Sequence, residues 1–244
     1  MTTPADVMVI AAHPDDAEFG VAGTVAQWTR EGRQVVYVVC TSGEKGTSDR
    51  SMKPELLAQI REKEQLAAAQ ILGVREVKFL RYPDQGLEET PQLRKHIVGL
   101  IRMFQPSVVV TSDPYRRYLW HRDHRIIGQV TLDAVFPFAR DYLAYPDLLE
   151  EGLEPHKVEE ILFWAAEDVN YRSDITSTFD LKLAALQCHV TQVKELGIPD
   201  LKAWLRGFCR DLAAGENFEL AEAFHRVQIS GYPVSQANTL RSST

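Results

Sequence analysis

Three short runs of apolar, mostly β-branched residues constrain the fold more than any other feature of this sequence. They span 7–12, 35–40 and 108–111, and weaker runs of the same kind span 77–80 and 161–165. Runs of about four to eight such residues are typical of strands that are buried on both faces of a parallel sheet. We therefore expect a central sheet that is covered by helices on both sides.

Segments with helical spacing of apolar residues fill the intervals between these runs. The expected helices span 23–30, 54–72, 91–104, 125–136 and 179–196. Alternation of strands and helices predicts an α/β fold, a three-layer, Rossmann-like and mostly parallel sheet with right-handed crossovers. No linker-like composition divides the 244 residues. We expect a single domain over 1–244, with a flexible tail at 236–244.

Charge and cysteine content limit the classes of function. The 34 acidic and 27 basic residues give a formal net charge of −7. Because general nucleic-acid affinity requires clustered Lys and Arg, this acidic balance argues against it. Three scattered cysteines suit a reducing compartment. The N-terminal segment carries no basic stretch, and no apolar run reaches the roughly 18 residues of a membrane span. We expect a cytoplasmic protein with no nucleic-acid partner and no membrane span.

The first cluster of reactive side chains directly follows the run at 7–12. It reads His-Pro-Asp-Asp at 13–16, and ligands of open α/β sheets bind beyond the carboxyl ends of strands. His13 and Asp16 lie three residues apart in a turn, so both can reach one metal ion, whereas Asp15 can stay unligated near a metal-bound water. The alternative interpretation is structural: one of the aspartates caps the helix that follows.

A second cluster follows the run at 108–111. His121 and His124 lie three residues apart, with Asp123 between them, and share one face if a helix begins there. An exposed polar turn is the alternative. Because both strands are expected to end at the same sheet edge, the two clusters are expected to meet. Two histidines and one carboxylate leave an open position on Zn²⁺, where a bound water has a pKa near 7. A free carboxylate can then act as a general base, and a further histidine can donate a hydrogen bond to the oxyanion.

The ordered set of motifs resembles the zinc-dependent N-deacetylases of the LmbE/PIG-L family. The motifs are His-Pro-Asp-Asp at 13–16, His-x-Asp-His at 121–124, Thr-Ser-Gly-Glu-Lys-Gly at 41–46, an Arg-bearing helix around 61–73, Asp-Gln-Gly-Leu at 84–87, Lys182 and His-Val-Thr-Gln at 189–192. The resemblance spans about residues 5–230. The family includes sugar deacetylases of bacillithiol and mycothiol synthesis and the archaeal diacetylchitobiose deacetylases. Arg122 stands where the family usually has proline.

The resemblance implies a role for each of these residues. It implies one zinc ion per chain with three protein ligands, which are His13, Asp16 and His124. Asp15 is then the general base. His121 stabilises the oxyanion and is oriented by Asp123, a carboxylate expected to raise the pKa of this histidine. The resemblance also implies contacts to the sugar: Arg61 and Asp84 hold hydroxyl groups and His189 lines the pocket.

The function implied is a zinc-dependent hydrolase that removes an acetyl group from an N-acetylglucosamine-type sugar or glycoside, by attack of zinc-bound hydroxide on the amide. The substrate is then a small N-acetylated sugar. The chitobiose-type relatives are hexamers, so a homo-oligomer, trimer or hexamer, is expected. The segment 137–156 is expected to shape specificity.

Two other functions fit parts of the same pattern. His13, Asp15 and His124 also match the His-x-Asp…His triad of non-haem Fe(II) oxygenases, although those enzymes are built on jelly-roll sheets. A non-catalytic, metal-bearing sugar-binding module is the second alternative, and its expected signature is loss of Asp15 or His121. Both of these residues are present.

Overall fold

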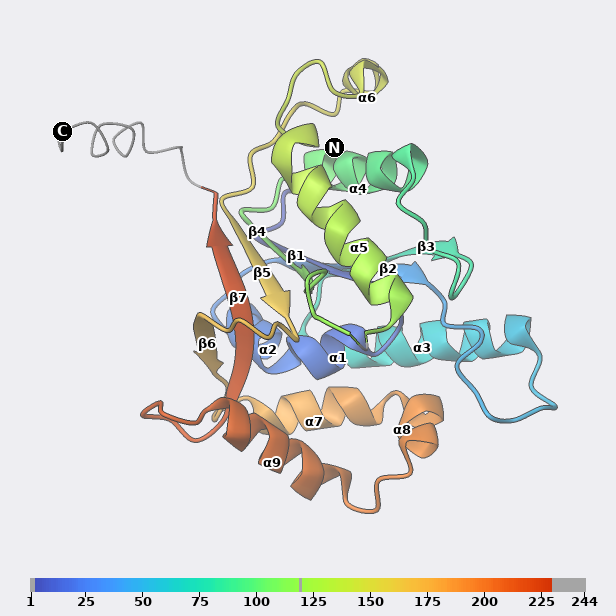
Figure 1. Ribbon diagram of the computed structural model, residues 1–244, viewed down its shortest axis with the longest axis vertical. Coiled ribbons are helices and arrows are strands. Elements are labelled where there is room, and N and C mark those ends of the chain that lie inside the picture. Colours follow the sequence, from blue (N-terminus) through green and yellow to red (C-terminus); the bar gives the residue numbers. More distant parts are fainter. Residues whose placement is uncertain (1–2, 119, 230–244) are drawn as a thin grey trace.

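The computed structural model describes residues 3–118 and 120–229, so the predicted flexible tail lies outside the described residues. The strands are β1 (Val7–Ala11), β2 (Val35–Thr41), β3 (Glu76–Tyr82), β4 (Val108–Ser112), β5 (Glu160–Trp164), β6 (Tyr171–Asp174) and β7 (Ala221–Gln228). Within the described residues they form one seven-stranded sheet in the order β3-β2-β1-β4-β5-β7-β6 (Figure 1). β1 to β5 pair in parallel, whereas β7 runs antiparallel to both β5 and β6. The predicted mostly parallel α/β sheet is confirmed.

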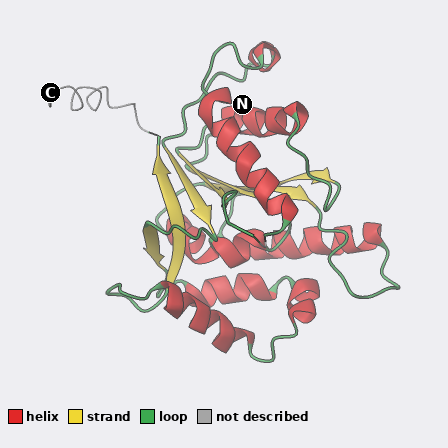
Figure 2. Cartoon of the chain, in the orientation of Figure 1, coloured by secondary structure: helices red, strands yellow, loops and turns green. Residues whose placement is uncertain are grey.

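Helices cover both faces of this sheet (Figure 2). They are α1 (Asp16–Gly20), α2 (Ala22–Arg30), α3 (Pro54–Leu72), α4 (Pro91–Phe104), α5 (Arg122–Asp133), α6 (Pro146–Glu150), α7 (Phe179–Gln187), α8 (Val190–Leu196) and α9 (Leu201–Leu212). α4 and α5 lie on one face and α1, α2 and α3 on the other (Figure 1). α7 packs on α2 and α3, and with α9 it forms a further layer on that side.

Hydrocarbon burial on both faces explains why β1, β2 and β4 read as unbroken apolar runs. Every residue of these three strands is buried. Alternate side chains enter two separate cores, so Met8 packs under α4 and α5 while Val9 packs under α2 and α3. A third core between α7 and α9 contains Phe179 and Leu205. This layering places the loops after β1 and β4 at one edge of the sheet.

The predicted helices differ from the observed ones in two places. The segment expected as one helix over 179–196 is two helices, because the backbone at His189 (φ −82°, ψ 60°) leaves the helical region between α7 and α8. The segment expected as a helix over 125–136 begins instead at Arg122 and passes into a π-helical turn, η1 (Ala134–Phe138), which contains Pro137.

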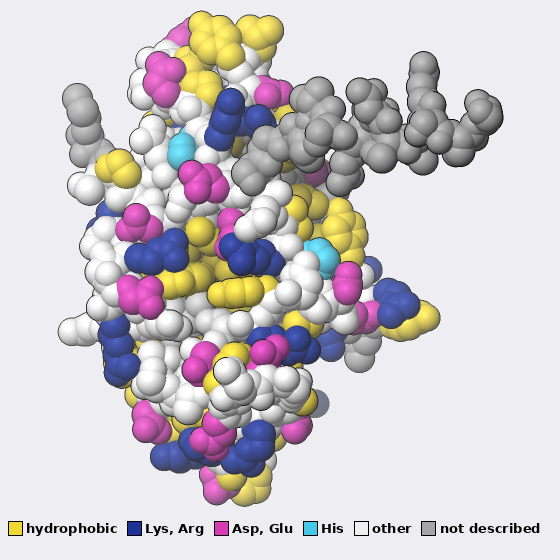
Figure 3. All heavy atoms as spheres, turned by 90° about the vertical axis from the view of Figure 1, so that its left-hand side faces the viewer, with side chains coloured by type: hydrophobic (Ala, Val, Ile, Leu, Met, Phe, Trp, Pro, Cys, Tyr) yellow, Lys and Arg dark blue, Asp and Glu magenta, His cyan; other side chains and the backbone are white. Residues whose placement is uncertain are grey.

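Charges of both signs are interspersed on the face that carries β7 and the edge strand β6 (Figure 3). Figure 3 shows Lys and Arg side chains alternating there with Asp and Glu and with small hydrophobic groups, which is the ordinary pattern of a solvated surface. Among the helices of the described residues, none has both the length and the apolar character that a membrane crossing requires.

A buried ion pair joins α7 to β7 beneath α1. Lys182 Nζ lies 2.7 Å from a carboxylate oxygen of Glu222, and both side chains are buried. Lys182 also donates to the carbonyls of Glu18 and Phe19 at the end of α1. The same Glu222 carboxylate accepts the backbone N–H of Thr24 at 2.8 Å. The pair therefore holds the C-terminal layer against the helix that follows the first motif.

We expect Lys182→Met to lower the free energy of unfolding by about 3–5 kcal/mol, because it leaves the Glu222 carboxylate buried and unpaired. Lys202→Met is the matched control: its partner Asp180 is 3.4 Å away and both side chains are exposed, so a change within about 0.5 kcal/mol is expected. Urea denaturation measures both variants. Equal changes in the free energy of unfolding would show that the buried Lys182–Glu222 pair is no more important for stability than the exposed pair.

Candidate active site

The site lies where the strand order of the sheet reverses. β1 has β2 on one side and β4 on the other, and ligands of open α/β sheets bind at such a reversal, beyond the carboxyl ends of the strands. The loop after β1 carries residues 13–16 and leads into α1. The loop after β4 ends at His121, the N-cap of α5. The two predicted clusters therefore meet.

Three side chains converge through metal-ligand atoms. His13 Nδ1 lies 3.1 Å from His124 Nε2, and a carboxylate oxygen of Asp16 lies 2.9 Å from the same His124 nitrogen. The other Asp16 oxygen is 3.5 Å from His13 Nδ1 and accepts the backbone N–H of His13 at 2.8 Å. Burial alone would raise the pKa of Asp16, but the charges and hydrogen bonds of His124 and His13 together outweigh it and hold the pKa well below its usual range.

The donor set and its spacing fit a tetrahedral divalent cation. Zinc–nitrogen and zinc–oxygen bonds of about 2.0–2.1 Å place ligand atoms about 3.4 Å apart in tetrahedral geometry. His13 Nδ1 and His124 Nε2 are 3.1 Å apart, and Asp16 approaches them through different oxygens, at 3.5 Å and 2.9 Å, so each separation is close to that value. Two imidazole nitrogens that face each other across 3.1 Å also need a cation or a proton between them. These residues therefore suit a zinc ion with an open fourth position.

The opposite edge of the His13 ring faces two carboxylates. Its Nε2 lies 3.1 Å from Asp84 and 3.4 Å from Asp123. Burial would lower the pKa of His13, but hydrogen bonding to Asp123, Asp16 and Asp84 outweighs it and raises the pKa well above 6.5. Within the described residues, two groups of three offer ligand atoms within 4.8 Å of one another: His13, His121 and His124, and His13, Asp84 and Asp123. We interpret the two carboxylates as acceptors of the Nε2 hydrogen, which leaves the Nδ1 lone pair for a metal.

Asp15 makes a different set of contacts, to Gln65 and Arg61. Its backbone adopts φ +92°, and its side chain makes no helix-capping hydrogen bond; the capping alternative therefore does not apply to Asp15. Its backbone N–H donates to Gln65 Oε1 at 3.1 Å, and its carboxylate lies 3.4 Å from the guanidinium of Arg61. Burial raises the pKa of Asp15 to about 6, against the opposing charge of Arg61. Such a carboxylate can accept a proton near neutral pH.

His121 is the N-cap of α5, and its ring lies beside the rings of His13 and His124. Its Nδ1 accepts the backbone N–H of Asp123 at 3.1 Å, so in the neutral ring the hydrogen sits on Nε2. The expected rise in the pKa of His121 is not observed. Burial and the neighbouring His13 and His124 lower this pKa, and the charge of Asp123 only partly opposes them. The neutral ring still offers one N–H.

The Asp123 carboxylate does not play the predicted orienting role. The hydrogen bond to His121 comes from the Asp123 backbone, whereas the fully buried carboxylate accepts the backbone N–H of Gln85 at 2.7 Å and faces His13 Nε2 at 3.4 Å. The structure therefore places the Asp123 carboxylate against His13, a predicted metal ligand, rather than against His121.

Arg61 and Asp84 lie at the site, but much of their hydrogen-bonding capacity is already engaged. Arg61 is buried on α3 and donates to the carbonyls of Gly43 at 2.8 Å and Pro14 at 2.6 Å. A Cβ at Gly43 (φ +64°) would lie 2.1 Å from that guanidinium, so the residue must be glycine. Asp84 accepts the backbone N–H of Lys45 at 2.9 Å. Burial would raise the pKa of Asp84, but hydrogen bonding to His13 lowers it to about 2. A sugar contact for either residue stays a prediction.

His189 is placed differently from the prediction. It does not line the pocket: its side chain is fully buried, with Nε2 3.0 Å from Glu18 Oε2, because the break between α7 and α8 turns it inward. Glu18 also accepts from Gln65 at 3.0 Å, which links this pair to the backbone of Asp15. The sequence interpretation missed Glu18 and Gln65. Gln65 follows Arg61 by one helical turn on the buried face of α3, and that spacing was an available signal.

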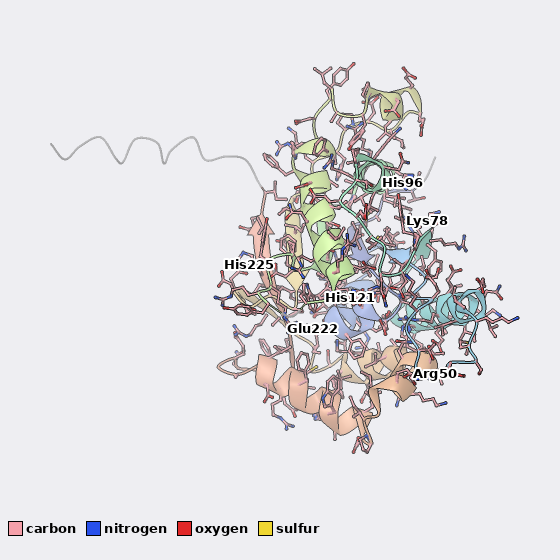
Figure 4. The ribbon with its side chains drawn as sticks, turned by 45° about the vertical axis from the view of Figure 1, so that its right-hand side comes forward. Arg50, Lys78, His96, His121, Glu222 and His225 are labelled. Atoms are coloured by element: carbon pink, nitrogen blue, oxygen red, sulfur yellow. The ribbon has the colours of Figure 1, made fainter. Side chains whose placement is uncertain are left out.

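A polar pocket of about 230 Å³ surrounds this centre. It is lined by His13, Asp15, Asp16, Gly46, Arg61, Asp84, Gln85, His121, His124 and Gln192. His96 and His225, by contrast, lie at the periphery, whereas His121 is central (Figure 4). The segment 137–156, expected to shape specificity, packs on the end of α4, where Arg102 donates to carbonyls of residues 138–144. It lies at the end of the molecule that carries α6, away from the centrally placed site (Figure 1).

Comparisons with known proteins agree with this geometry. Residues 8–135 match the PIG-L family model, described as GlcNAc-PI de-N-acetylase. The chain belongs to the PIG-L family. The diacetylchitobiose deacetylase of Thermococcus kodakarensis is 35% identical over 189 residues, which cover 78% of this chain and 70% of that protein. The 1D-myo-inositol 2-acetamido-2-deoxy-alpha-D-glucopyranoside deacetylase of Mycobacteroides abscessus is 30% identical over 77% of this chain and 81% of its own length.

A solved structure of the family has the same fold. The N,N'-diacetylchitobiose deacetylase from Pyrococcus horikoshii, complexed with its inhibitor MPG, superposes with a TM-score of 0.85 at 31% identity. The match covers 92% of this PIG-L chain and 84% of that one. The family relatives are named as deacetylases, which are amide hydrolases, and they confirm the predicted family and class of enzyme.

Proposed function

We propose that this PIG-L protein is a zinc-dependent N-deacetylase that acts on an N-acetylglucosamine-type sugar or glycoside. One observation carries the proposal: His13 Nδ1, Asp16 and His124 Nε2 converge within 3.5 Å of one another beside a carboxylate, Asp15, that is outside this ligand set. The names of the relatives, which act on acetylated sugars, support the substrate class. The cytoplasmic location and the trimeric or hexameric assembly stay predictions.

Each of the residues around the pocket has a separate role in amide hydrolysis. His13, Asp16 and His124 would hold the zinc ion, which would supply Lewis acidity and lower the pKa of a water molecule. The Asp15 carboxylate takes a proton from the attacking water, and the same carboxyl group can return it to the leaving nitrogen as the C–N bond breaks. His121 Nε2–H donates to the carbonyl oxygen as negative charge develops there. The products are acetate and the amino sugar.

Acetate release tests this proposal directly. N-acetylglucosamine, diacetylchitobiose and N-acetylglucosaminyl glycosides are incubated with the protein before and after chelation with EDTA and after zinc is added back. We expect release that EDTA abolishes and zinc restores. Oxygen consumption under Fe(II) without acetate release would favour the oxygenase alternative, and sugar binding without turnover would favour the non-catalytic module.

Metal content tests the ligand set. We expect about one zinc ion per chain, and we expect His13→Ala or His124→Ala to empty the site because either change leaves only two protein ligands. His96→Ala, at the periphery (Figure 4), is the matched control and should keep full occupancy. Elemental analysis of the purified variants gives the ratio; full zinc in both ligand variants would overturn the assignment.

A further inference from the structure

A second pocket lies on the other side of the metal-ligand residues. It has a volume of about 280 Å³, and aromatic side chains dominate its walls. These are Phe19 from α1, Trp120 from the loop after β4, Trp164 at the end of β5, and Trp204 and Phe208 from α9. We refer to it as the apolar pocket. The reaction as derived above makes no use of it.

The apolar pocket and the polar pocket share two residues, and these are metal-ligand residues. Asp16 and His124 line both cavities. A carbonyl carbon that reacts at this position therefore has a cavity on each side of it. The two groups attached to a scissile amide carbonyl, the amine part and the acyl part, extend in different directions from that carbon. Each cavity can thus receive one of them.

The chemistry of the walls decides which group enters which cavity. The polar pocket presents Arg61, Asp84 and Gln192, which suit the hydroxyl groups of a sugar. Of the charged groups that line the apolar pocket, Lys182 and Glu222 pair with each other at 2.7 Å, and the Arg116 guanidinium lies over the Trp120 ring, 4.6 Å from its centroid. Figure 4 shows Glu222 below His121, near the centre of the molecule. The apolar pocket therefore suits hydrocarbon, and the acyl part is the apolar half of such a substrate.

The walls of the apolar pocket are held in place by packing. A Cβ at Gly20 would lie 2.6 Å from the Trp164 ring, so this indole packs directly on the backbone of α1. Ala165, which follows it, adopts φ +58°, a conformation that alanine rarely takes and that clusters at functional sites. Trp120 donates to Asp113 O at 2.9 Å and contacts the His124 ring edge-on at 4.7 Å. The cavity is therefore preformed beside a metal-ligand residue.

The size of the apolar pocket exceeds what an acetyl group requires. The methyl of an acetyl group is about as large as a water molecule, about 30 Å³, against the 280 Å³ available. We propose that this enzyme hydrolyses N-acyl sugars whose acyl chain is longer than acetyl, with several carbons of the chain in the apolar pocket. The inference rests on the proposed amide hydrolysis and extends its substrate class.

A series of substrates with one common product tests the inference. N-acetyl-, N-butanoyl-, N-hexanoyl- and N-octanoylglucosamine all release glucosamine, so one assay gives kcat/KM for each. We expect kcat/KM to rise by about fourfold for each methylene that enters the pocket and then to level off. A value that stays constant or falls from acetyl onward, with acetyl still hydrolysed, overturns the inference and leaves the proposed deacetylase function standing.

Variants locate the effect. Ala166 lines the apolar pocket, and Ala166→Trp is expected to bring the ratio of kcat/KM for the octanoyl and acetyl substrates close to one by filling the cavity. Ala214→Trp, on an exposed turn after α9, is the matched control and should keep the wild-type ratio. An unchanged ratio in Ala166→Trp overturns the inference.

Two further experiments, with an alkyl glycoside and with a binding measurement, complete the test. Octyl N-acetylglucosaminide carries its alkyl chain on the glycosidic oxygen. If kcat/KM exceeds that of N-acetylglucosamine for this compound but not for N-octanoylglucosamine, the pocket binds the aglycone and the inference is overturned. Calorimetry with the Asp15→Asn protein compares binding of N-octanoyl- and N-acetylglucosamine. If no compound is hydrolysed, the proposed function fails. The acyl pocket is still supported if N-octanoylglucosamine binds more tightly than N-acetylglucosamine and Ala166→Trp removes this difference. Equal binding of the two compounds refutes the acyl pocket.

Discussion

Replacement of Asp15 by asparagine is expected to lower kcat by about 10²–10⁴-fold while zinc stays bound, because the amide cannot take a proton from the attacking water. The geometry should survive the change. Asp15 has φ +92°, and asparagine tolerates positive φ better than other non-glycine residues. The hydrogen bond to Gln65 comes from the Asp15 backbone and is retained. Acetate release at saturating substrate and elemental analysis measure the two quantities separately.

The adjacent carboxylate supplies the control. Asp16→Asn should lower zinc occupancy first, because Asp16 lies 2.9 Å from His124 Nε2 and 3.5 Å from His13 Nδ1, and its activity should recover in part when zinc is added in excess. Asp15→Asn activity should not recover with zinc. If the two variants exchange these behaviours, Asp15 is the ligand and Asp16 the base.

Loss of His121 is expected to lower kcat by about 10²–10³-fold, the effect typical of removing one preorganised oxyanion donor. The ligand atoms of His121, His13 and His124 lie within 4.8 Å of one another, but His121 is not one of the three proposed ligands, so zinc content should stay near one per chain in His121→Ala. KM should change less than kcat, since the developing negative charge exists only in the transition state. Steady-state kinetics on N-acetylglucosamine and metal analysis of the same preparation give both values.

A second substitution separates catalysis from structure at this position. His121 also caps α5, with its Nδ1 accepting the Asp123 N–H. Asparagine is a good N-cap residue, so His121→Asn should retain the thermal stability of the protein yet recover only a small part of the rate. His225→Ala, at the periphery in Figure 4, should behave as wild type. A wild-type kcat in His121→Asn would show that His121 serves the helix cap alone.

Local patterns in the sequence predicted the central strands and most of the helices. The runs that became β1, β2 and β4 are buried on both faces, so nearly every position is apolar and the signal is strong. β7, at Ala221–Gln228, was missed because it carries Glu222, His225 and Arg226 among its apolar residues. It pairs with β5 through contacts between residues 60 to 68 positions apart in sequence, such as Glu160 and Gln228. Local periodicity does not report such pairing.

The sequence by itself determined that two His/Asp clusters follow two buried strands, and parallel pairing of β1 with β4 was enough to bring them together. Only the tertiary structure decided how individual atoms are used. It turned His13 Nδ1 toward His124 and its Nε2 toward Asp84, and it buried His189 against Glu18. It also closed the apolar pocket with α9 and β5. Ring orientation and cavity walls depend on packing between distant segments, and residue order does not encode that packing locally.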